Sequence, residues 1–259
     1  AKDEHYYEAI KYATDMGADI INLSLGGTPG LKAAEAYLEA GGNMEEALEL
    51  LNPGSFAEFK KKFPIDYQKE YDALKYASDK GVVIVAAMGN DSLEEYRKEL
   101  QILGNTDVFT SIPADFSEEI PGLISVVAMN NKGDKSNYSS FGSKASIAAP
   151  GGEFSTLIGS TIYSTSLENS YIGKAGTSMA APIVSGAAAL LLARNPDLTP
   201  AEVKKILVDE ADSFKWLEEA VPNGKYLNVE KALENKLVTV DKGDAKFSIT
   251  GTRAVGFVL

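Results

Sequence analysis

The chain has 259 residues, enough for one large domain with a sizeable core or for two small ones. Hydrophobic residues make up 44% and charged residues 24% of the sequence, which argues against wholesale disorder, and the formal net charge of -12 argues against nucleic acid as a partner. The absence of cysteine excludes disulfides, thiol catalysis and cysteine-based zinc sites.

Helical patterns alternate with short apolar runs along much of the chain. An amphipathic helix is predicted before Gly17 and another before Gly81, and each glycine is a typical helix stop. The apolar runs that predict buried strands lie at residues 18–25, 82–87, 121–130 and 144–152. Apolar runs without polar alternation, separated by helices, are typical of a parallel sheet buried on both faces. The predicted fold class is therefore α/β, with a mainly parallel sheet flanked by helices.

Two polar segments interrupt this alternation. Residues 28–70 contain two helical patterns and the basic cluster FKKKF, and we interpret them as a helical insertion whose lysines form a solvated surface. Residues 92–120 form a second irregular and acidic connection.

The segment GKAGTSMAAPIVSGAAALLLARNP, residues 173–196, contains the longest apolar run of the chain. Residues 179–194 predict a helix that is buried on all sides, and their Ala and Gly content favours a core helix over a membrane span. Ser178 stands at the N-terminus of this helix, where free backbone N–H groups favour negative charge. A serine here is either a simple helix cap or a nucleophile whose reaction creates an oxyanion.

The C-terminal part predicts a capped helix followed by a hairpin. Thr199 is the expected N-cap, with Pro200 in the first turn and Glu202 at the third position. Alternating residues around the sequence DKGD predict a β-hairpin, so we divide the chain into a main domain, 1–236, and a hairpin extension, 237–259.

Three motifs together carry a family resemblance. INLSLGG (21–27), VVIVAAMGN (82–90) and GTSMAAPIVSG (176–186) resemble, in this order, the substrate-binding, oxyanion and nucleophile motifs of subtilisin-like serine peptidases, the subtilases. The similarity is to the C-terminal part of their catalytic domain, which carries the nucleophilic Ser and the oxyanion Asn.

The resemblance implies roles for particular residues. Ser178 would attack the scissile carbonyl to form an acyl-enzyme, and its backbone N–H together with the side-chain amide of Asn90 would stabilise the oxyanion. The implied substrate-binding residues are Ser24, Leu25 and Gly26 as an extended edge, Ala86, Ala87 and Met88 as pocket walls, and also Gly89 and Thr177. The floor of the pocket would lie somewhere in residues 102–118.

The acid–base half of the family's triad does not match this sequence. The single histidine, His5, lacks the family's context, and only residues 1–23 precede Ser24. Asp3 and Asp19 do not stand in the family's Asp turn, and Ala175 replaces the small polar residue that usually precedes GTS. Strands of the family's sheet would also be missing, which would expose one flank of a parallel sheet unless something covers it.

Two hypotheses follow for the function. In the first, the chain is part of a serine endopeptidase that is active when a separate chain or segment supplies the Asp and His, for example an N-terminal fragment of the same precursor that stays bound without a disulfide. In the second, it is a catalytically inert pseudo-peptidase that holds peptides or a partner at the substrate-binding edge. A swapped homo-oligomer could also close the open flank. The expected partners are polypeptide substrates or inhibitors.

The resemblance carries three further expectations. It implies an extracellular or cell-surface location. The first residue, Ala rather than Met, is compatible with processing from a longer precursor but also with simple Met removal. The chemistry itself needs no cofactor. The family often binds calcium in loops, although no EF-hand-like spacing of ligands occurs here.

Overall fold

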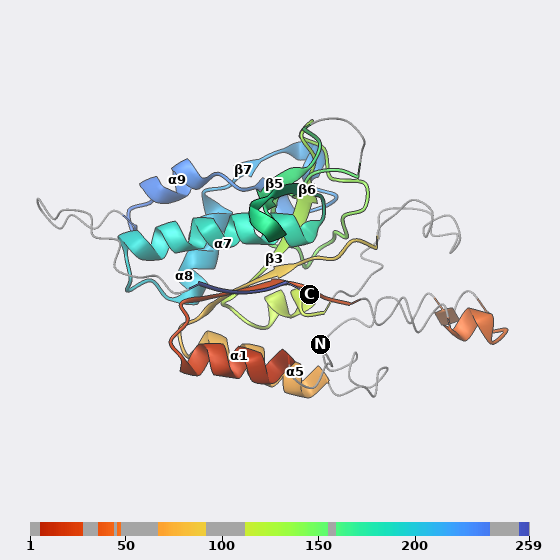
Figure 1. The fold of residues 1–259 in the computed structure, drawn as a ribbon, viewed down its shortest axis with the longest axis horizontal. Coiled ribbons are helices and arrows are strands. Elements are labelled where there is room, and N and C mark those ends of the chain that lie inside the picture. The colour runs from red at the N-terminus through yellow and green to blue at the C-terminus, as the bar shows by residue number, and fades with distance from the viewer. Residues whose placement is uncertain are drawn as a thin grey trace, which may run out of the picture.

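A seven-stranded, mostly parallel sheet lies between two layers of helices in a computed structural model of the chain (Figure 1). The structure describes residues 6–27, 36–43, 46–47, 67–91, 112–154, 159–238 and 254–258. The strand order is β7-β8-β4-β3-β2-β1-β9. These strands are β1 Ile20–Ser24, β2 Val83–Ala87, β3 Leu123–Met129, β4 Ile147–Pro150, β7 Asp212–Ser213, β8 Lys225–Tyr226 and β9 Ala254–Val258. The predicted α/β class is confirmed.

The central strands are apolar because they are covered on both faces. Every residue of β1, β2 and β3 is buried. All four strands predicted from apolar runs are present, with each end within three residues of its expected position. Their continuous burial explains why the sequence shows no polar alternation there.

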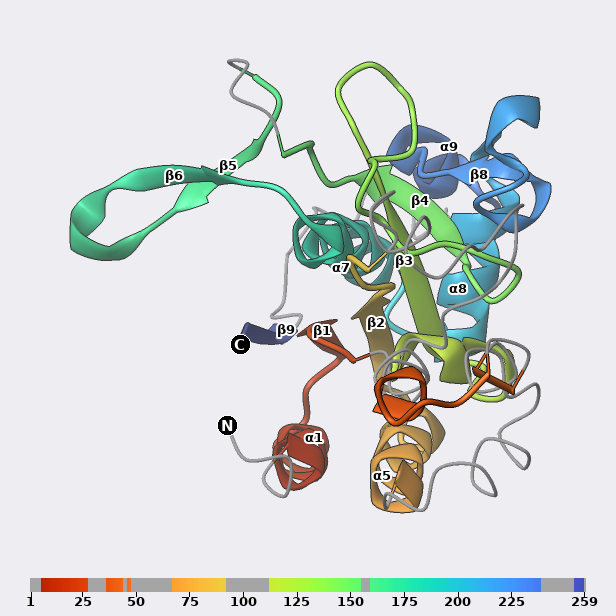
Figure 2. The ribbon, with the colours of Figure 1, turned by 90° about the vertical axis from the view of Figure 1, so that its right-hand side faces the viewer.

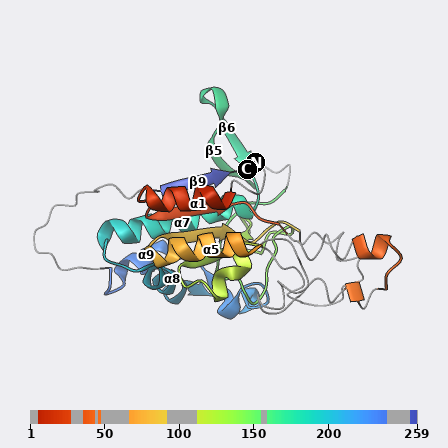
Figure 3. The same ribbon diagram turned by 90° about the horizontal axis from the view of Figure 1, so that it is seen from below.

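The helices form one layer on each face of the sheet. Helices α1 (Tyr6–Asp15) and α5 (Tyr67–Asp79) lie on one face, as Figures 1 and 3 show, with α7 (Thr177–Arg194), α8 (Pro200–Asp209) and α9 (Val229–Glu234) on the other. Single-turn 3-10 helices lie at Ala114–Glu118, Leu167–Asn169, Lys215–Leu217 and Pro222–Gly224. Two buried apolar clusters, one on each face, join these layers to the sheet.

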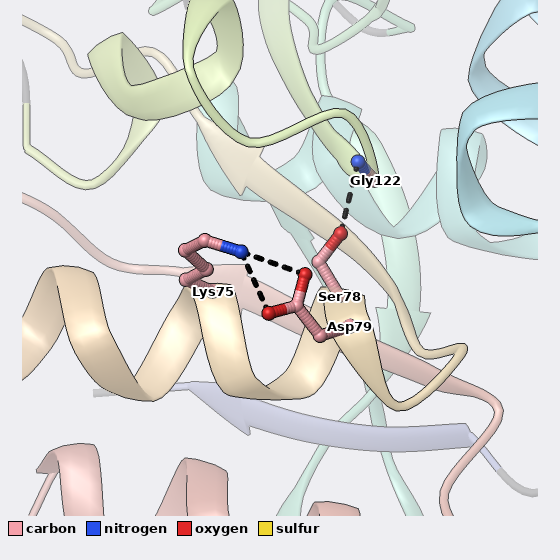
Figure 4. A network of polar contacts seen from close by, with 4 residues as sticks. All are labelled: Lys75, Ser78, Asp79 and Gly122. Carbon is pink, nitrogen blue, oxygen red and sulfur yellow. Dashed lines mark hydrogen bonds and ion pairs between the residues drawn. The ribbon is translucent and has the colours of Figure 1, made fainter.

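A close contact fixes the position of α5 against the loop that leads into β3 (Figure 4). The N–H of Gly122 donates to Ser78 Oγ at 3.2 Å, in the same turn of the helix as the exposed Lys75–Asp79 ion pair. A Cβ at Gly122 would stand 2.6 Å from Pro200 Cβ and 2.7 Å from Ser78 Oγ. Only glycine fits where α5, this loop and the start of α8 meet.

Helix α8 begins as the sequence predicts. The N–H of Glu202 donates to Thr199 Oγ1 at 3.3 Å, and the N–H of Thr199 donates to the Glu202 carboxylate at 2.8 Å. This reciprocal pair is a capping box, and Pro200 occupies the first turn where its missing N–H costs nothing.

Helix α7 is a core helix, but the expectation that it is buried on all sides is wrong. One face packs over β1, β2, β3 and β4. Pro182, Gly186 and Leu190 recur every four residues and form an exposed stripe on another face, with Leu190 49% exposed. By its length and composition alone, α7 could also cross a membrane. Its apolar composition has another explanation, because a helix that covers a sheet needs a long apolar face.

The C-terminal extension contributes a strand to the main sheet. Strand β9 pairs in parallel with β1, from Ile20 opposite Ala254 to Ser24 opposite Val258. It is thus the edge strand of the main sheet. The hairpin predicted around DKGD falls on residues 239–253, which lie outside the described residues.

A hairpin occurs elsewhere, where none was predicted. Strands β5 (Ile162–Thr165) and β6 (Tyr171–Lys174) pair antiparallel and form an arm that projects from the body of the molecule (Figure 2). Of the predicted insertion, only residues 36–43, 46–47 and the start of α5 are described, and residues 36–39 are helical.

Candidate active site

Ser178 is the second residue of α7, immediately after a glycine turn. Gly176, with φ of 153°, adopts a conformation that favours glycine, and its N–H donates to the Gly151 carbonyl at 3.0 Å. The N–H groups of Met179 and Ala180 both donate to the Gly176 carbonyl. Within the described part of the chain, the N–H of Ser178 has no hydrogen-bond partner, so it is available to a ligand at the positive end of the helix.

The amide of Asn90 is oriented by the residue before Ser178. Its Oδ1 accepts from the Thr177 N–H at 2.9 Å and from Thr177 Oγ1 at 3.1 Å. Because a backbone N–H can only donate, the atom that faces it must be the oxygen. The Asn90 Nδ2 group therefore points elsewhere and has no partner among the described residues; it lies 3.7 Å from the position a Cβ would take on Gly176. The Ser178 N–H and the Asn90 Nδ2 group are thus two free donors on either side of the turn at Gly176.

Hydrogen bonds in both directions connect Ser178 to the end of β1. Ser24 Oγ donates to the Ser178 carbonyl at 2.7 Å, and Ser178 Oγ donates to the Ser24 carbonyl at 3.2 Å. This carbonyl is the one acceptor that the Ser178 hydroxyl has among the described residues. A carbonyl does not take up a proton at neutral pH, so the hydroxyl stays a neutral and weakly nucleophilic alcohol.

A buried polar network behind this contact was missed by the sequence analysis. Asn22 Nδ2 donates to Ser24 Oγ at 2.8 Å, and Ser185 Oγ donates to Asn22 Oδ1 at 2.9 Å. Asn22 and Ser185 are each 8% exposed. The sequence did indicate these two residues, because Asn22 and Ser185 are polar residues inside mostly apolar segments, and buried polar groups need partners. The network joins the third turn of α7 to the strand that holds its first turn.

The turn beneath Ser178 rests on a tyrosine that stays neutral. Tyr138 is fully buried, and its hydroxyl donates to the carbonyls of Gly151 and Gly152 at 2.9 and 2.8 Å. Burial raises the pKa of Tyr138 to about 12. A Cβ at Gly151 would stand 2.4 Å from Ala128 Cβ, so the backbone there approaches β3 as closely as glycine allows.

The predicted substrate edge is partly paired already. Gly27 exchanges two hydrogen bonds with Ile112, at 2.9 and 3.0 Å, which brings the middle of the predicted pocket-floor segment, 102–118, beside the glycines. Gly26 is exposed, Leu25 is half-buried, and Ser24 is 3% exposed. A substrate could therefore reach the backbone at residues 25 and 26 but not Ser24. Residues 102–111 lie outside the described residues.

Other predicted substrate contacts have different roles in the structure. Thr177 is fully buried and positions the Asn90 amide, and Gly89 uses its N–H on Thr177 Oγ1 and its carbonyl on the Ser140 N–H. Ala86 and Met88 pack in one buried cluster and Ala87 packs in the cluster on the opposite face. Side chains alternate along a strand, so these three cannot share one pocket wall, and only their backbone could line a pocket.

Of the acid–base residues considered in the sequence, only Asp19 lies in the described part of the chain. His5 and Asp3 lie outside the described residues. Asp19 directly precedes β1 and so stands at the end of the strand opposite Ser24. The described residues contain no group of three or more His, Cys, Asp or Glu side chains that could hold a metal ion.

Comparison with known proteins gives a consistent result. A sequence model of the Subtilase family matches residues 1–243. The chain is 29% identical over 211 residues to subtilisin DY of Bacillus licheniformis, covering 80% of this chain and 56% of that protein. It is 32% identical over 182 residues to thermitase of Thermoactinomyces vulgaris, covering 70% of this chain and 43% of that protein.

Solved structures agree on the fold. The epidermin leader peptide processing serine protease of Staphylococcus aureus is 25% identical with a TM-score of 0.62, covering 93% of this chain and 55% of that one. The nisin leader peptidase NisP of Lactococcus lactis is 22% identical with a TM-score of 0.64, covering 94% and 66%. The chain spans about half the length of the two curated relatives named above.

Proposed function

This chain belongs to the subtilase family, and on that premise we propose that it is the nucleophile-bearing part of a serine endopeptidase. The observation that carries the proposal is the pair of free donors, the Ser178 N–H and the Asn90 Nδ2, on either side of the turn that presents the Ser178 hydroxyl. Donors fixed before the substrate arrives stabilise developing negative charge without a cost of reorganisation.

In the proposed reaction, Ser178 Oγ attacks the carbonyl carbon of a peptide bond while a base takes its proton. The carbonyl oxygen becomes the oxyanion and accepts hydrogen bonds from the Ser178 N–H and the Asn90 Nδ2. The protonated base then gives the proton to the leaving amine, and water hydrolyses the acyl-enzyme by the same steps. Thr177 and Gly89 contribute by holding the Asn90 amide in place.

The base and its orienting carboxylate are proposed to come from a separate chain or segment that carries the family's Asp and His. An N-terminal fragment of the same precursor is the proposed source. This proposal is supported by the neutral contact of Ser178 Oγ with a backbone carbonyl and by the single histidine of the sequence. With no cysteine in this chain, the association would be non-covalent.

An extracellular or cell-surface location is proposed from family membership alone. The acyl-transfer steps are proposed to need no cofactor, and no calcium ion is assigned a role in them.

Active-site labelling tests the proposal. The purified protein is treated with a fluorophosphonate, which forms an Oγ–P bond, releases fluoride and gives the serine proton to the base, and denaturing intact masses are then read. We expect a second polypeptide in the sample and one probe mass on this chain, lost in Ser178→Ala. Asn90→Ala should label about 10²–10³-fold more slowly, because the phosphoryl oxygen loses one donor. An unlabelled, folded chain in the presence of a second polypeptide with Asp and His would refute the proposal.

A peptide-binding pseudo-peptidase is the second candidate. It is favoured by the hydrogen bond of Ser178 Oγ to the Ser24 carbonyl, which leaves the hydroxyl inactive in this chain by itself. It predicts that a folded, unlabelled chain still binds extended peptides, and that substitution of Gly26 weakens this binding while Ser178→Ala does not.

A further inference from the structure

Pro182 deprives the carbonyl of Ser178 of its regular helical partner. In an α-helix each carbonyl accepts from the N–H four residues later, and Pro182 stands four residues after Ser178 inside α7. Proline has no N–H, and its ring also crowds the carbonyl of the residue four positions before it. The Ser178 carbonyl therefore needs a donor from outside the helix, at the very residue that carries the proposed nucleophile.

Ser24, at the end of β1, supplies that donor. Its Oγ lies 2.7 Å from the Ser178 carbonyl oxygen, and because a carbonyl can only accept, the Ser24 hydroxyl proton must point at it. Ser24 is 3% exposed, so little water competes for the contact. The hydrogen bond that Pro182 cannot donate within α7 is thus replaced by one from the sheet.

The direction of the hydrogen bonds behind Ser24 follows from this first one. Because the Ser24 hydroxyl donates its proton to Ser178, its oxygen accepts from Asn22, whose Nδ2 group faces it at 2.8 Å. The Asn22 Oδ1 then faces Ser185, whose hydroxyl donates to it at 2.9 Å. Hydrogen bonds aligned in one direction polarise and strengthen one another. The three side chains form a relay that starts and ends on α7, on either side of Pro182.

We propose that Asn22 and Ser185 are positioning residues for the nucleophile, because their relay through Ser24 replaces the helical hydrogen bond that Pro182 cannot make and so fixes the backbone of Ser178. The inference rests on the proposed function for the role of Ser178. Asn22 and Ser185 are each 8% exposed, so they are closed to a substrate and act through Ser24. The carbonyl that the relay holds belongs to the same residue as the attacking Oγ and the oxyanion-binding N–H, so a displaced carbonyl misplaces both groups.

The Ser178 carbonyl resonance tests the relay without requiring activity. The sequence contains one Ser–Met pair, Ser178–Met179, so protein made by cell-free synthesis with carbonyl-13C serine and 15N methionine gives a single coupled NMR signal. A donor at the carbonyl oxygen draws electron density from the carbon, so weakening that hydrogen bond moves the signal to lower frequency. We expect this shift in Ser185→Ala and in Asn22→Leu, because each removes a hydrogen bond that fixes the direction of the Ser24 hydroxyl.

Thr14→Val is the matched control for Ser185→Ala. Thr14 and Ser185 are both helical hydroxyls that are 8% exposed, and each donates to the carbonyl four residues before it, at 2.8 and 3.1 Å. Ser185 differs in that it also donates to Asn22. Each substitution removes one buried hydroxyl, but only Ser185→Ala should move the Ser178 signal. An unchanged signal in both Ser185→Ala and Asn22→Leu would overturn the relay and leave the proposed function intact.

Pro182→Ala tests whether the relay substitutes for the helical hydrogen bond. The variant restores an N–H four residues after Ser178, so the Ser178 carbonyl gains a donor from its own helix. We therefore expect Asn22→Leu to move the Ser178 signal less in the Pro182→Ala background than in the native chain, a coupling measured by a double-mutant cycle. An equal shift in the two backgrounds would overturn the proposed link between the relay and Pro182.

Fluorophosphonate labelling in the presence of the second polypeptide tests the effect on the nucleophile. We expect Ser185→Ala and Asn22→Leu to lower the maximal labelling rate by about three- to tenfold, with the half-saturating probe concentration unchanged, and Thr14→Val to label like the native chain. A shifted carbonyl signal with a native labelling rate would overturn the positioning role. Shifted signals with no labelling of any protein, the native chain included, would refute the peptidase and retain the relay as the support of the Ser178 backbone.

Discussion

The polar network behind Ser178 can be tested by changing Asn22 to Asp, which preserves shape and alters one atom. Asn22 Oδ1 accepts from Ser185 Oγ, and an aspartate can still do so. Asn22 Nδ2 donates to Ser24 Oγ at 2.8 Å, and an ionised aspartate cannot donate there. The new carboxylate is also buried, since the side chain it replaces is only 8% exposed. The ionised aspartate at position 22 therefore lacks the hydrogen bond to Ser24 Oγ, and its charge is also removed from water.

The loss of folding stability in Asn22→Asp can be worked out from the burial of the carboxyl group and from proton linkage. Burial without a cation raises the pKa of a carboxylic acid, and a rise of about two units corresponds to about 2.7 kcal/mol. The protonated acid can donate to Ser24 as the amide does. Because the folded pKa lies above the unfolded value of about 3.9, the folded state binds more protons between the two, and stability falls as pH rises through this window. We expect Asn22→Asp to cost about 1 kcal/mol near pH 4 and about 3–4 kcal/mol at pH 7.

Urea unfolding at a series of pH values measures this effect as a difference from the native chain. Because the pI is about 4.7, points from pH 5.5 to 8 avoid the region of lowest solubility and still cover the upper part of the window. Asn22→Ala is the control: it removes two hydrogen bonds without adding a charge, so it should cost about 2–3 kcal/mol at every pH. A difference between Asn22→Asp and the native chain that does not change with pH would refute the reasoning.

Three further predictions concern stability. Gly122→Ala should destabilise the fold by about 1–3 kcal/mol, because the new Cβ would stand 2.6 Å from Pro200 Cβ; chemical denaturation measures this, and an unchanged midpoint would contradict the close packing. Gly186→Ala should stabilise it by about 0.5–1 kcal/mol, since this exposed helical position has nothing within 4 Å of a Cβ; a loss of stability would show that the stripe is not open. Burial lowers the pKa of Lys204 to about 8, so the folded state binds fewer protons than the unfolded state between about pH 8 and 10.4. The stability of the native chain relative to Lys204→Met should therefore rise over this window by up to about 1.4 kcal/mol per pH unit, and a flat or falling difference in urea unfolding would contradict it.

The features predicted from the sequence are those that local patterns encode. The buried strands are continuous apolar runs, and the capping box of α8 lies within four residues, from Thr199 to Glu202. The β5–β6 arm was missed because its turn carries no glycine: Glu168 and Asn169 take the positive φ values themselves, at 57° and 54°.

The remaining features depend on contacts between distant parts of the chain. Asn22 and Ser185 meet across 163 residues, and no local pattern states that one polar residue faces the other. The pairing of β9 with β1 is equally non-local, and the alternation that suggested a hairpin is compatible with any exposed strand position. The exposed stripe of α7 could not be predicted, because the composition of a helix does not show which of its faces the rest of the fold leaves uncovered.

Two hydrogen bonds join Ser178 and Ser24, and they fix the backbone of the proposed nucleophile separately from the direction of its hydroxyl. Ser24 Oγ holds the backbone of Ser178 through its carbonyl at 2.7 Å, whereas the Ser178 hydroxyl is held only by its own bond at 3.2 Å. Turning that hydroxyl towards a base needs one side-chain rotation and the loss of one hydrogen bond, at a net cost of about 1 kcal/mol. Such rotations take picoseconds to nanoseconds. In the proposed mechanism, the serine would respond within that time once a base is in place, and the arrival of the base would set the rate at which the site becomes reactive.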